Sequence, residues 1–374
     1  MTYRPHRKRG RTTLLLMGAL IFAGEIAAGF LIDRAPLEIR FPEVTRILNA
    51  VQEKRSENNI LFFGSSRFGN DISADAVLQE LRDARVEDGI SVFNAFIPAG
   101  DPVVMEFETD QLLAEGIRPS MVVIEILPEV LSRRNMWLHY HLARQFRWPE
   151  VWNSLPDAYL AGKLSQVIAT RFNSVYLFRS EFQRWTMDAL KLRLESANLR
   201  DGNARQRRRA NLLEPADAAA LQAGTALGRK NVRDYEIGGL NARALIRMIE
   251  RYSKLGTTII FVAPPVSSPY RAAYNSPIDA AYRAYMHRLG ETYGTYFFDY
   301  RHRLGDHQFW TPYYANTDGK LHFSRLLARE VIVPLITRTK ELGRPSRSEA
   351  TPDIPAKPAI EVQTLPDAGP RRGG

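Results

Sequence analysis

The chain has 374 residues, 45% of them hydrophobic, so it is long and apolar enough to bury one large core or two small ones. It contains no cysteine, which excludes disulfides and thiolate metal sites. Its seven histidines form no HExxH motif or comparable ligand cluster. We therefore expect neither a metal nor another cofactor.

The formal net charge is +10, and its meaning depends on where the basic residues lie. One group precedes a long apolar segment, and a second lies in a polar stretch with no interleaved aromatic residues and no helix-turn-helix or finger pattern. The first group is Arg4, Arg7, Lys8, Arg9 and Arg11, and the second is Arg205, Arg207, Arg208 and Arg209. This distribution favours membrane topology and a solvated loop, so we expect no nucleic-acid partner.

The apolar segment, LLLMGALIFAGEIAAGFLI, covers residues 14–32 and is long enough to cross a hydrocarbon core of about 30 Å. Basic residues before it and few directly after it place the N-terminus in the cytoplasm and the rest of the chain in the periplasm. A cleaved signal peptide would have an apolar core of about 7–15 residues and a small-residue exit. Here the run continues past Ala27 and Ala28, so we predict an uncleaved anchor in the inner membrane.

Glu25 lies inside this span, where a charged side chain costs roughly 2.5–3.5 kcal/mol on insertion scales. One interpretation is that it is protonated and tolerated. The other is that it meets a polar group on a membrane partner, since Ala23, Gly24, Ala27 and Ala28 allow a close helix approach. The sequence leaves both interpretations open.

Five nearly continuous apolar runs are typical of parallel strands covered on both faces, and they lie at residues 59–64, 90–95, 121–127, 257–263 and 295–300. Helical patterns with capping or terminating signals lie between most of them, at residues 73–84, 103–116 and 241–256. Strands alternating with helices predict an α/β fold built on a three-layer, doubly wound parallel sheet.

The stretch 130–238 contains no convincing strand, and we predict a helical insertion that caps one edge of the sheet. The end of the chain is Pro-rich and poor in large apolar residues, so we expect it to be disordered. The predicted division is a basic cytoplasmic tail at 1–12, the anchor at 13–32, the sheet domain at 56–129 and 239–342, the insertion at 130–238, and the tail at 343–374.

Chemistry is expected beyond the carboxyl ends of the strands, where open parallel sheets bind ligands. GSSRF, residues 64–68, follows the first strand but lacks the second glycine of a GxSxG elbow, which disfavours the α/β-hydrolase interpretation. A serine nucleophile needs a base, and NTDGKLHFS, residues 316–324, supplies a candidate just before the final helix. In that block Asp318 could orient His322.

With these blocks the chain resembles the SGNH (GDSL-like) hydrolase superfamily, and more closely its extracytoplasmic branch of teichoic-acid D-alanyl transfer and alginate O-acetylation proteins. The resemblance covers about residues 57–335 outside the insertion. FFGSSR is similar to the first family block, which implies that Ser66 is the nucleophile and that its N–H is an oxyanion donor. VFNAFIPAGDP is similar to the second and implies Gly100 as the second donor; NTDGKLHFS is similar to the last and implies His322 and Asp318.

Two departures from the family pattern stand in this sequence. The third block usually supplies an asparagine to the oxyanion hole, whereas VVIEILPEVL has Glu125, Pro128 and Glu129. Loss of one such donor raises the barrier by about 2.7–4 kcal/mol in other enzymes. The second departure is that three residues, rather than two, separate Asp318 from His322.

The resemblance implies a membrane-anchored periplasmic O-acyl transferase or esterase, with acetyl as the expected group and a cell-envelope or exported polysaccharide as the substrate. It also implies a multispanning membrane acyltransferase as a partner that delivers the acyl group. Arg67, beside the nucleophile, either binds an anionic group or sugar hydroxyl or faces solvent. The alternative function is a catalytically inactive SGNH-like scaffold or binding module of a polysaccharide modification or export complex.

Overall fold

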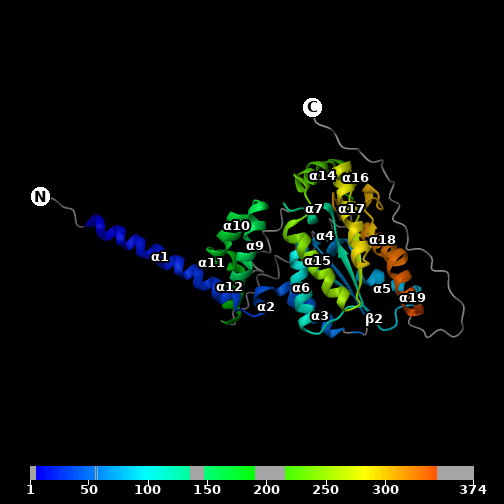
Figure 1. Ribbon diagram of the computed structural model, residues 1–374, viewed down its shortest axis with the longest axis horizontal. Helices are drawn as coiled ribbons and strands as arrows, with labels where there is room; N and C mark the ends of the chain where they lie inside the picture. Colours follow the sequence, from blue (N-terminus) through cyan, green and yellow to red (C-terminus); the bar gives the residue numbers. More distant parts are fainter. Residues whose placement is uncertain (1–5, 55, 57, 135–146, 190–214, 343–374) are drawn as a thin grey trace, which may run out of the picture.

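The structure is a computed structural model that describes residues 6–54, 56, 58–134, 147–189 and 215–342 (Figure 1). The Pro-rich tail and the basic cluster at 205–209 lie outside the described residues, as do residues 1–5 of the predicted cytoplasmic tail. The described chain forms a long N-terminal helix, a group of short helices beside the end of that helix, and a sheet domain (Figure 1).

Five parallel strands form the main sheet in the order β2-β1-β3-β4-β5. The strands are β1 (Asn58–Gly64), β2 (Ile90–Phe96), β3 (Met121–Glu125), β4 (Thr258–Ala263) and β5 (Tyr296–Asp299). Strands β1, β3 and β4 are buried along nearly their whole length, which accounts for their unbroken apolar sequences. The predicted α/β fold with a doubly wound parallel sheet is confirmed.

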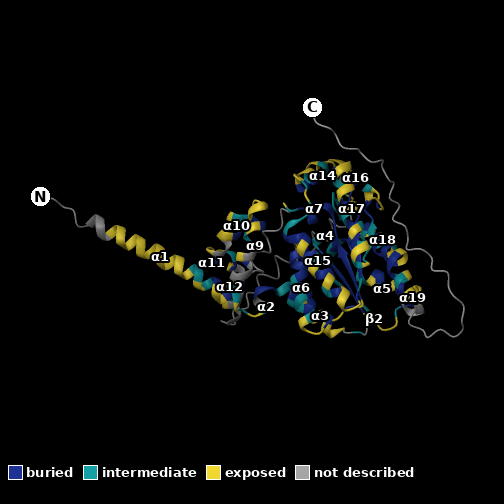
Figure 2. Cartoon of the chain, in the orientation of Figure 1, coloured by how far each residue is buried: buried dark blue, intermediate teal, exposed yellow. Residues whose placement is uncertain are grey.

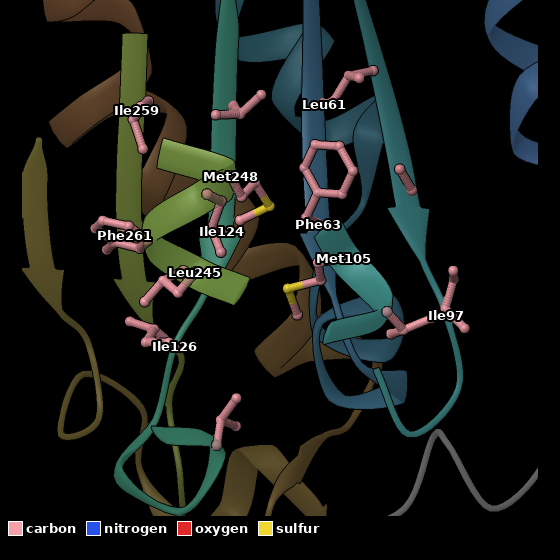
Figure 3. Packing of buried hydrophobic residues seen from close by; sticks show 14 of the residues in the cluster. Leu61, Phe63, Ile97, Met105, Ile124, Ile126, Leu245, Met248, Ile259 and Phe261 are labelled. Carbon is pink, nitrogen blue, oxygen red and sulfur yellow. The ribbon is translucent and has the colours of Figure 1, made fainter. Parts of the chain in front are cut away.

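Alternate residues of each strand enter two separate cores. Phe63 of β1, Ile124 of β3 and Phe261 of β4 lie on one face, which α15 covers with Leu245 and Met248 (Figure 3). The helices of this face are α3 (Pro42–Glu53), α6 (Pro102–Ala114), α15 (Gly239–Lys254) and α17 (Ser276–Tyr293). The opposite face is covered by α4 (Ser66–Asp71), α5 (Ala74–Asp83), α18 (Thr317–Leu327) and α19 (Val333–Leu342).

The segment between the anchor and the first strand, which the predicted division leaves unassigned, forms two helices. They are α2 (Leu37–Arg40) and α3, and α3 buries Val44, Ile47, Leu48 and Val51 against the sheet. These four residues recur at the spacing of one helix face, and Pro42 occupies the first helical turn, where its missing N–H has no consequence. Helix α3 therefore contributes to the core on one face of the sheet.

The predicted insertion contains five described helices and, within the described residues, one isolated bridge between Ser132 and Ile237. The helices are α9 (Trp148–Leu160), α10 (Leu164–Arg171), α11 (Ser174–Leu177), α12 (Arg179–Ala189) and α14 (Ala218–Asn231). Figure 1 shows α9 to α12 beside the C-terminal end of α1, whereas α14 lies against the sheet domain next to α16 (Ser268–Arg271). The exact boundaries of the insertion remain a prediction.

Helix α1 (His6–Asp33) contains a stretch, Gly10–Asp33, that is long and apolar enough to cross a membrane. Its first half exposes leucine, methionine and isoleucine side chains, while the sheet domain buries its apolar residues (Figure 2). An N-terminal helix with these properties is either a membrane anchor or a signal sequence.

Asp101 is buried at the N-terminus of α6, where its Oδ1 accepts hydrogen bonds from the N–H groups of Val103 and Val104, both at 3.1 Å. Burial raises the pKa of this carboxyl to about 7. At pH values between the unfolded-state pKa and this folded value, the folded protein holds a proton that the unfolded chain has released. This group therefore makes the protein less stable as the pH rises through that window.

Replacing Asp101 by asparagine should remove this dependence, because the amide still accepts the capping hydrogen bonds but cannot ionise. The loss of unfolding free energy from about pH 5 to about pH 7 should become shallower by up to about 1.4 kcal/mol per pH unit. Urea titrations of the detergent-solubilised chain at several pH values measure this slope. Asp217→Asn, at the exposed N-cap of α14, is the control, and equal slopes for Asp101→Asn and wild type would contradict the prediction.

Candidate functional site

The first two predicted blocks meet at the carboxyl edge of the sheet. Strand β1 ends at Gly64, and Ser65 caps α4 by accepting a hydrogen bond from the Arg67 N–H at 3.1 Å. Gly100 lies against this turn so closely that a Cβ atom there would stand 2.7 Å from the Gly64 carbonyl oxygen and 2.8 Å from that of Ile97. Glycine at position 100 is therefore required for the two segments to approach each other.

A cavity of about 230 Å³ opens at this edge. It is lined by residues from five separate segments: Ser65, Ser66, Arg67, Ala99, Gly100, Glu125, Glu129, Val130, Leu227, Asn231, Tyr313 and Tyr314. Three of the residues singled out from the sequence, Ser66, Gly100 and Arg67, are thus brought together. Asp318 and His322 are not among the lining residues.

The hydroxyl of Ser66 forms a hydrogen bond with a tyrosine. Ser66 Oγ lies 2.7 Å from the hydroxyl of Tyr314, in the short strand β7 (Tyr314–Ala315). The next residue, Ala315, donates its N–H to Asp71 Oδ1 at 2.8 Å, which ties this loop to α4. Burial raises the pKa of Tyr314, so its phenol is neutral at physiological pH and can donate or accept a proton in a hydrogen bond.

Asp318 and His322 form a separate polar cluster with Gln308. They stand one turn apart on α18, so the extra residue between them, which departs from the family spacing, puts both on the same helix face. Gln308 Nε2 lies 3.0 Å from His322 Nδ1 and 3.2 Å from Asp318 Oδ2. The Gln308 orientation is fixed because its Oε1 accepts the Gly305 N–H at 3.2 Å.

This arrangement selects the tautomer of a neutral His322 ring. An amide nitrogen only donates, so His322 Nδ1 accepts and a neutral ring carries its proton on Nε2. In that tautomer neither ring nitrogen is available to take a proton from a serine. Among the described residues, no hydrogen bond joins Ser66 to His322 or His322 to Asp318, so the predicted direct relay is not formed in this structure.

The two predicted oxyanion donors also differ in availability. Ser66 is the first residue of α4, where an N–H has no acceptor within the helix. The Gly100 N–H instead donates to the Ile97 carbonyl oxygen at 2.8 Å, inside the turn that follows β2. The predicted role of Gly100 as a second donor would therefore need this turn hydrogen bond to open.

Arg67 does not face solvent, as one of the two sequence interpretations had it. It is 6% exposed, and its Nη1 lies 3.1 Å from Glu129 Oε1 and 3.9 Å from Glu125 Oε1. Tyr270 and Tyr274 each donate a hydroxyl hydrogen bond to Glu129, at 2.8 and 2.7 Å. The third block, which lacks the family asparagine, thus supplies the two carboxylates that hold this buried arginine.

Glu125 also fixes the serine turn. Its carboxylate accepts hydrogen bonds from the Ser65 N–H at 2.6 Å and from the Ser65 hydroxyl at 3.1 Å. Burial raises the pKa of Glu125, and Arg67 opposes the shift. A carboxylate that accepts these bonds cannot donate to an oxyanion, so Glu125 does not replace the chemical role of an asparagine.

Two polar atoms at the cavity are buried without a hydrogen-bond partner among the described residues: Arg67 Nε, a donor, and Asn231 Oδ1, an acceptor. The aromatic rings of Tyr313 and Tyr314 complete this wall, with the Arg67 guanidinium carbon 5.2 Å from the Tyr313 ring centroid. Sequence reasoning missed Gln308, Asn231, Tyr313 and Tyr314. The aromatic residues of WTPYYAN, which leads into the last block, were the feature of the sequence that could have pointed to Tyr313 and Tyr314.

Within the described residues, no group of three or more histidine, aspartate or glutamate side chains is arranged to hold a metal ion.

Comparisons with known proteins include a distant similarity of fold. No protein-family model matches the chain, and no curated protein matches it. Among solved structures it is similar to the crystal structure of LAE5, an alpha/beta hydrolase enzyme from the metagenome of Lake Arreo, Spain. The alignment covers 73% of this chain and 94% of that chain, at 12% sequence identity and a TM-score of 0.33. At these values the similarity says nothing about the chemistry of the cavity.

Proposed function

We propose that the chain is a membrane-anchored, periplasm-facing enzyme that transfers or hydrolyses an O-acyl group, with acetyl as the expected group, on a cell-envelope or exported polysaccharide. The observation that carries the proposal is the position of Ser66. Its hydroxyl stands at the carboxyl edge of a parallel sheet, in a cavity of about 230 Å³, at hydrogen-bond distance from a neutral tyrosine. A cavity of this size suits a small acyl ester better than a long acyl chain.

The charges around the cavity favour a neutral, hydroxyl-rich ligand. One cation, Arg67, faces two carboxylates, so the lining offers no excess positive charge to an anion. Ser66, Asn231 and Tyr314 contribute hydroxyl and amide groups to the lining, and such groups exchange hydrogen bonds with sugar hydroxyls. The Tyr313 and Tyr314 rings provide an apolar surface for a sugar ring.

In the proposed reaction, Ser66 Oγ forms a bond to the acyl carbon and the bond between that carbon and the sugar oxygen breaks. Tyr314 accepts the Ser66 proton while giving its own phenolic proton to the departing sugar oxygen, so the tyrosine remains neutral overall. Water or a second sugar hydroxyl then takes the acyl group from Ser66, and the same relay runs in reverse. The Ser66 N–H at the start of α4 is the donor nearest the developing oxyanion.

The role of His322 as the base, supported by the family resemblance, would need its ring to leave Gln308 Nε2 and free Nδ1 to carry the proton. A multispanning membrane acyltransferase remains the expected source of the acyl group. These two elements of the proposal rest on the resemblance rather than on the contacts of the cavity.

The second candidate is a non-catalytic glycan-binding or scaffold module. It is favoured by a specific observation: Gln308 stands between Asp318 and His322, and the Gly100 N–H is engaged within its own turn. In that case the cavity would bind a polysaccharide without turning it over.

Covalent trapping separates the two candidates. The full chain in detergent micelles is incubated with a serine-directed fluorophosphonate and digested, and the modified peptide is identified by mass spectrometry. The enzyme proposal expects the label on Ser66, still present in Ser65→Ala and absent in Ser66→Ala. A folded protein that takes no label at Ser66, yet binds an acetylated polysaccharide by calorimetry, would establish the scaffold instead.

A further inference from the structure

The second half of α1 contacts the helical insertion. The rings of Phe22 and Phe172 stack with their centroids 5.2 Å apart. Three residues further along α1, Glu25 Oε2 accepts a hydrogen bond from the Val175 N–H, at the start of α11, at 2.8 Å. The carboxyl group inside the apolar span thus meets a backbone donor of this same chain.

These contacts set the depth of the insertion if α1 crosses a membrane. Glu25 precedes Asp33, the end of the apolar helix, by eight residues, which corresponds to about 12 Å at 1.5 Å per residue. Half of a hydrocarbon core is about 15 Å. Helices α10 and α11 would therefore lie at the level of the outer leaflet, alongside the part of α1 that they contact (Figure 1).

Helix α9 has two apolar faces with different environments. One face places Val151 and Ala158 in a core cluster with Val103 of α6 and Ala244 of α15, which attaches the insertion to the sheet domain. The other face exposes large side chains: Trp152 is 64% exposed and Tyr159 is 70% exposed. An aromatic face of this size on the outside of a helix is typical of an interaction surface.

The next two helices also expose apolar and aromatic side chains. Ile168 of α10 and Val175 and Tyr176 of α11 are exposed, and Tyr176 is 62% exposed. A basic side chain accompanies it: the Arg179 guanidinium carbon lies 4.2 Å from the centroid of the Tyr176 ring, and its Nη1 donates to the Tyr176 carbonyl oxygen at 2.7 Å. Tryptophan and tyrosine with neighbouring arginine are the residues enriched at the boundary between acyl chains and headgroups.

We propose that α9, α10 and α11 form a membrane-seated platform. Its aromatic face, defined by Trp152, Tyr159, Ile168, Val175 and Tyr176, lies in the outer leaflet beside α1, and Arg179 meets a lipid phosphate. The platform is continuous with the membrane-crossing helix through Glu25 and Phe22. Because α9 is also packed against α6 and α15, the platform fixes the orientation of the sheet domain to the bilayer.

Site-specific spin labels test the proposal, since a chain without cysteine accepts a single introduced cysteine at any exposed position. The full chain is reconstituted in vesicles of phosphatidylcholine and phosphatidylglycerol, with labels at Trp152→Cys, Tyr159→Cys or Tyr176→Cys. Leu255→Cys, at the exposed end of α15, is the matched control. Collision rates with oxygen, which partitions into lipid, and with a water-soluble nickel chelate report the surroundings of each label.

We expect the three platform labels to collide several-fold less often with the nickel chelate than the Leu255→Cys label, and more often with oxygen. Platform labels as accessible to the nickel chelate as the control would overturn the proposal. Labels shielded from both reagents would overturn it as well, because they would place a protein partner or a second copy on this face. An N-terminal epitope tag, detected in the same vesicles, establishes that α1 has not been removed.

Discussion

Replacing Ser66 by alanine should lower kcat/KM for an activated acetyl ester by about 10³-fold or more, which is the scale on which loss of a serine nucleophile acts in other enzymes. The reason is structural as well as chemical. Ser66 Oγ lies 2.7 Å from the hydroxyl of Tyr314, the group proposed to relay its proton. Release of acetate or nitrophenol by the full chain in micelles is the measurement.

Three matched variants show which groups act with Ser66. Ser65→Ala should leave most of the activity, because Ser65 holds Glu125 and caps α4 rather than facing Tyr314. Tyr314→Phe removes the proposed relay, and we expect it to reduce kcat with little change in KM. His322→Gln removes the base implied by the resemblance, so a loss as large as that of Ser66→Ala would favour His322 over Tyr314. Full activity in Ser66→Ala would contradict the assignment of the nucleophile.

The fold could be predicted from the sequence because a parallel strand that is buried on both faces has a nearly unbroken apolar sequence. NILFFG, MVVIEIL and TTIIFVA are nearly unbroken apolar runs, and the structure places their central residues in β1, β3 and β4. The helix α3 was missed for the opposite reason. Its apolar residues are dispersed among polar ones, and only the helical period of Val44, Ile47, Leu48 and Val51 identifies the buried face.

The candidate site could be predicted only in part, because its residues come from distant segments whose contacts leave no local pattern. The structure places GSSRF at the carboxyl end of β1, as its sequence position after an apolar run predicts, and its role in ligand binding stays a prediction. The partner of Ser66 was not, because Tyr314 reaches it from 248 residues away through a short hairpin without a motif of its own. His322 illustrates the same limit: its spacing from Asp318 was visible, but the intervening Gln308 was not.

The third block departs from the family pattern, and the departure has a structural consequence around Arg67. Glutamates in place of an asparagine remove a donor, yet they also supply the buried negative charge that permits an arginine directly after the serine. Glu125 and Glu129 therefore form one unit with Arg67. This unit holds the serine turn through the Ser65 N–H and closes one wall of the cavity.

Replacing Arg67 by methionine should accordingly destabilise the folded protein by about 3–5 kcal/mol, the cost of removing one partner from a buried ion pair. The loss would leave Glu125 and Glu129 buried without their cation, while the methionine still fills much of the space beside Tyr270 and Tyr313. Urea unfolding of the detergent-solubilised chain, followed by far-ultraviolet circular dichroism, measures the change. Arg134→Met is the control, because Arg134 pairs with Asp234 on the surface and should contribute no more than about 1 kcal/mol.

The deficit of Arg67→Met should also depend on pH in a defined direction. Burial already raises the pKa of Glu125, and loss of Arg67 removes the attraction that opposes this shift. For a carboxyl whose folded pKa lies above its unfolded value, the stabilising contribution is fully present below the unfolded pKa and is lost as the pH rises through the folded pKa. The variant should therefore be closest to wild type in acid and furthest from it above neutrality. A deficit of less than about 1 kcal/mol at every pH would contradict the prediction. It would mean that the ion pairs of Arg67 contribute no more to stability than the exposed pair of Arg134 and Asp234.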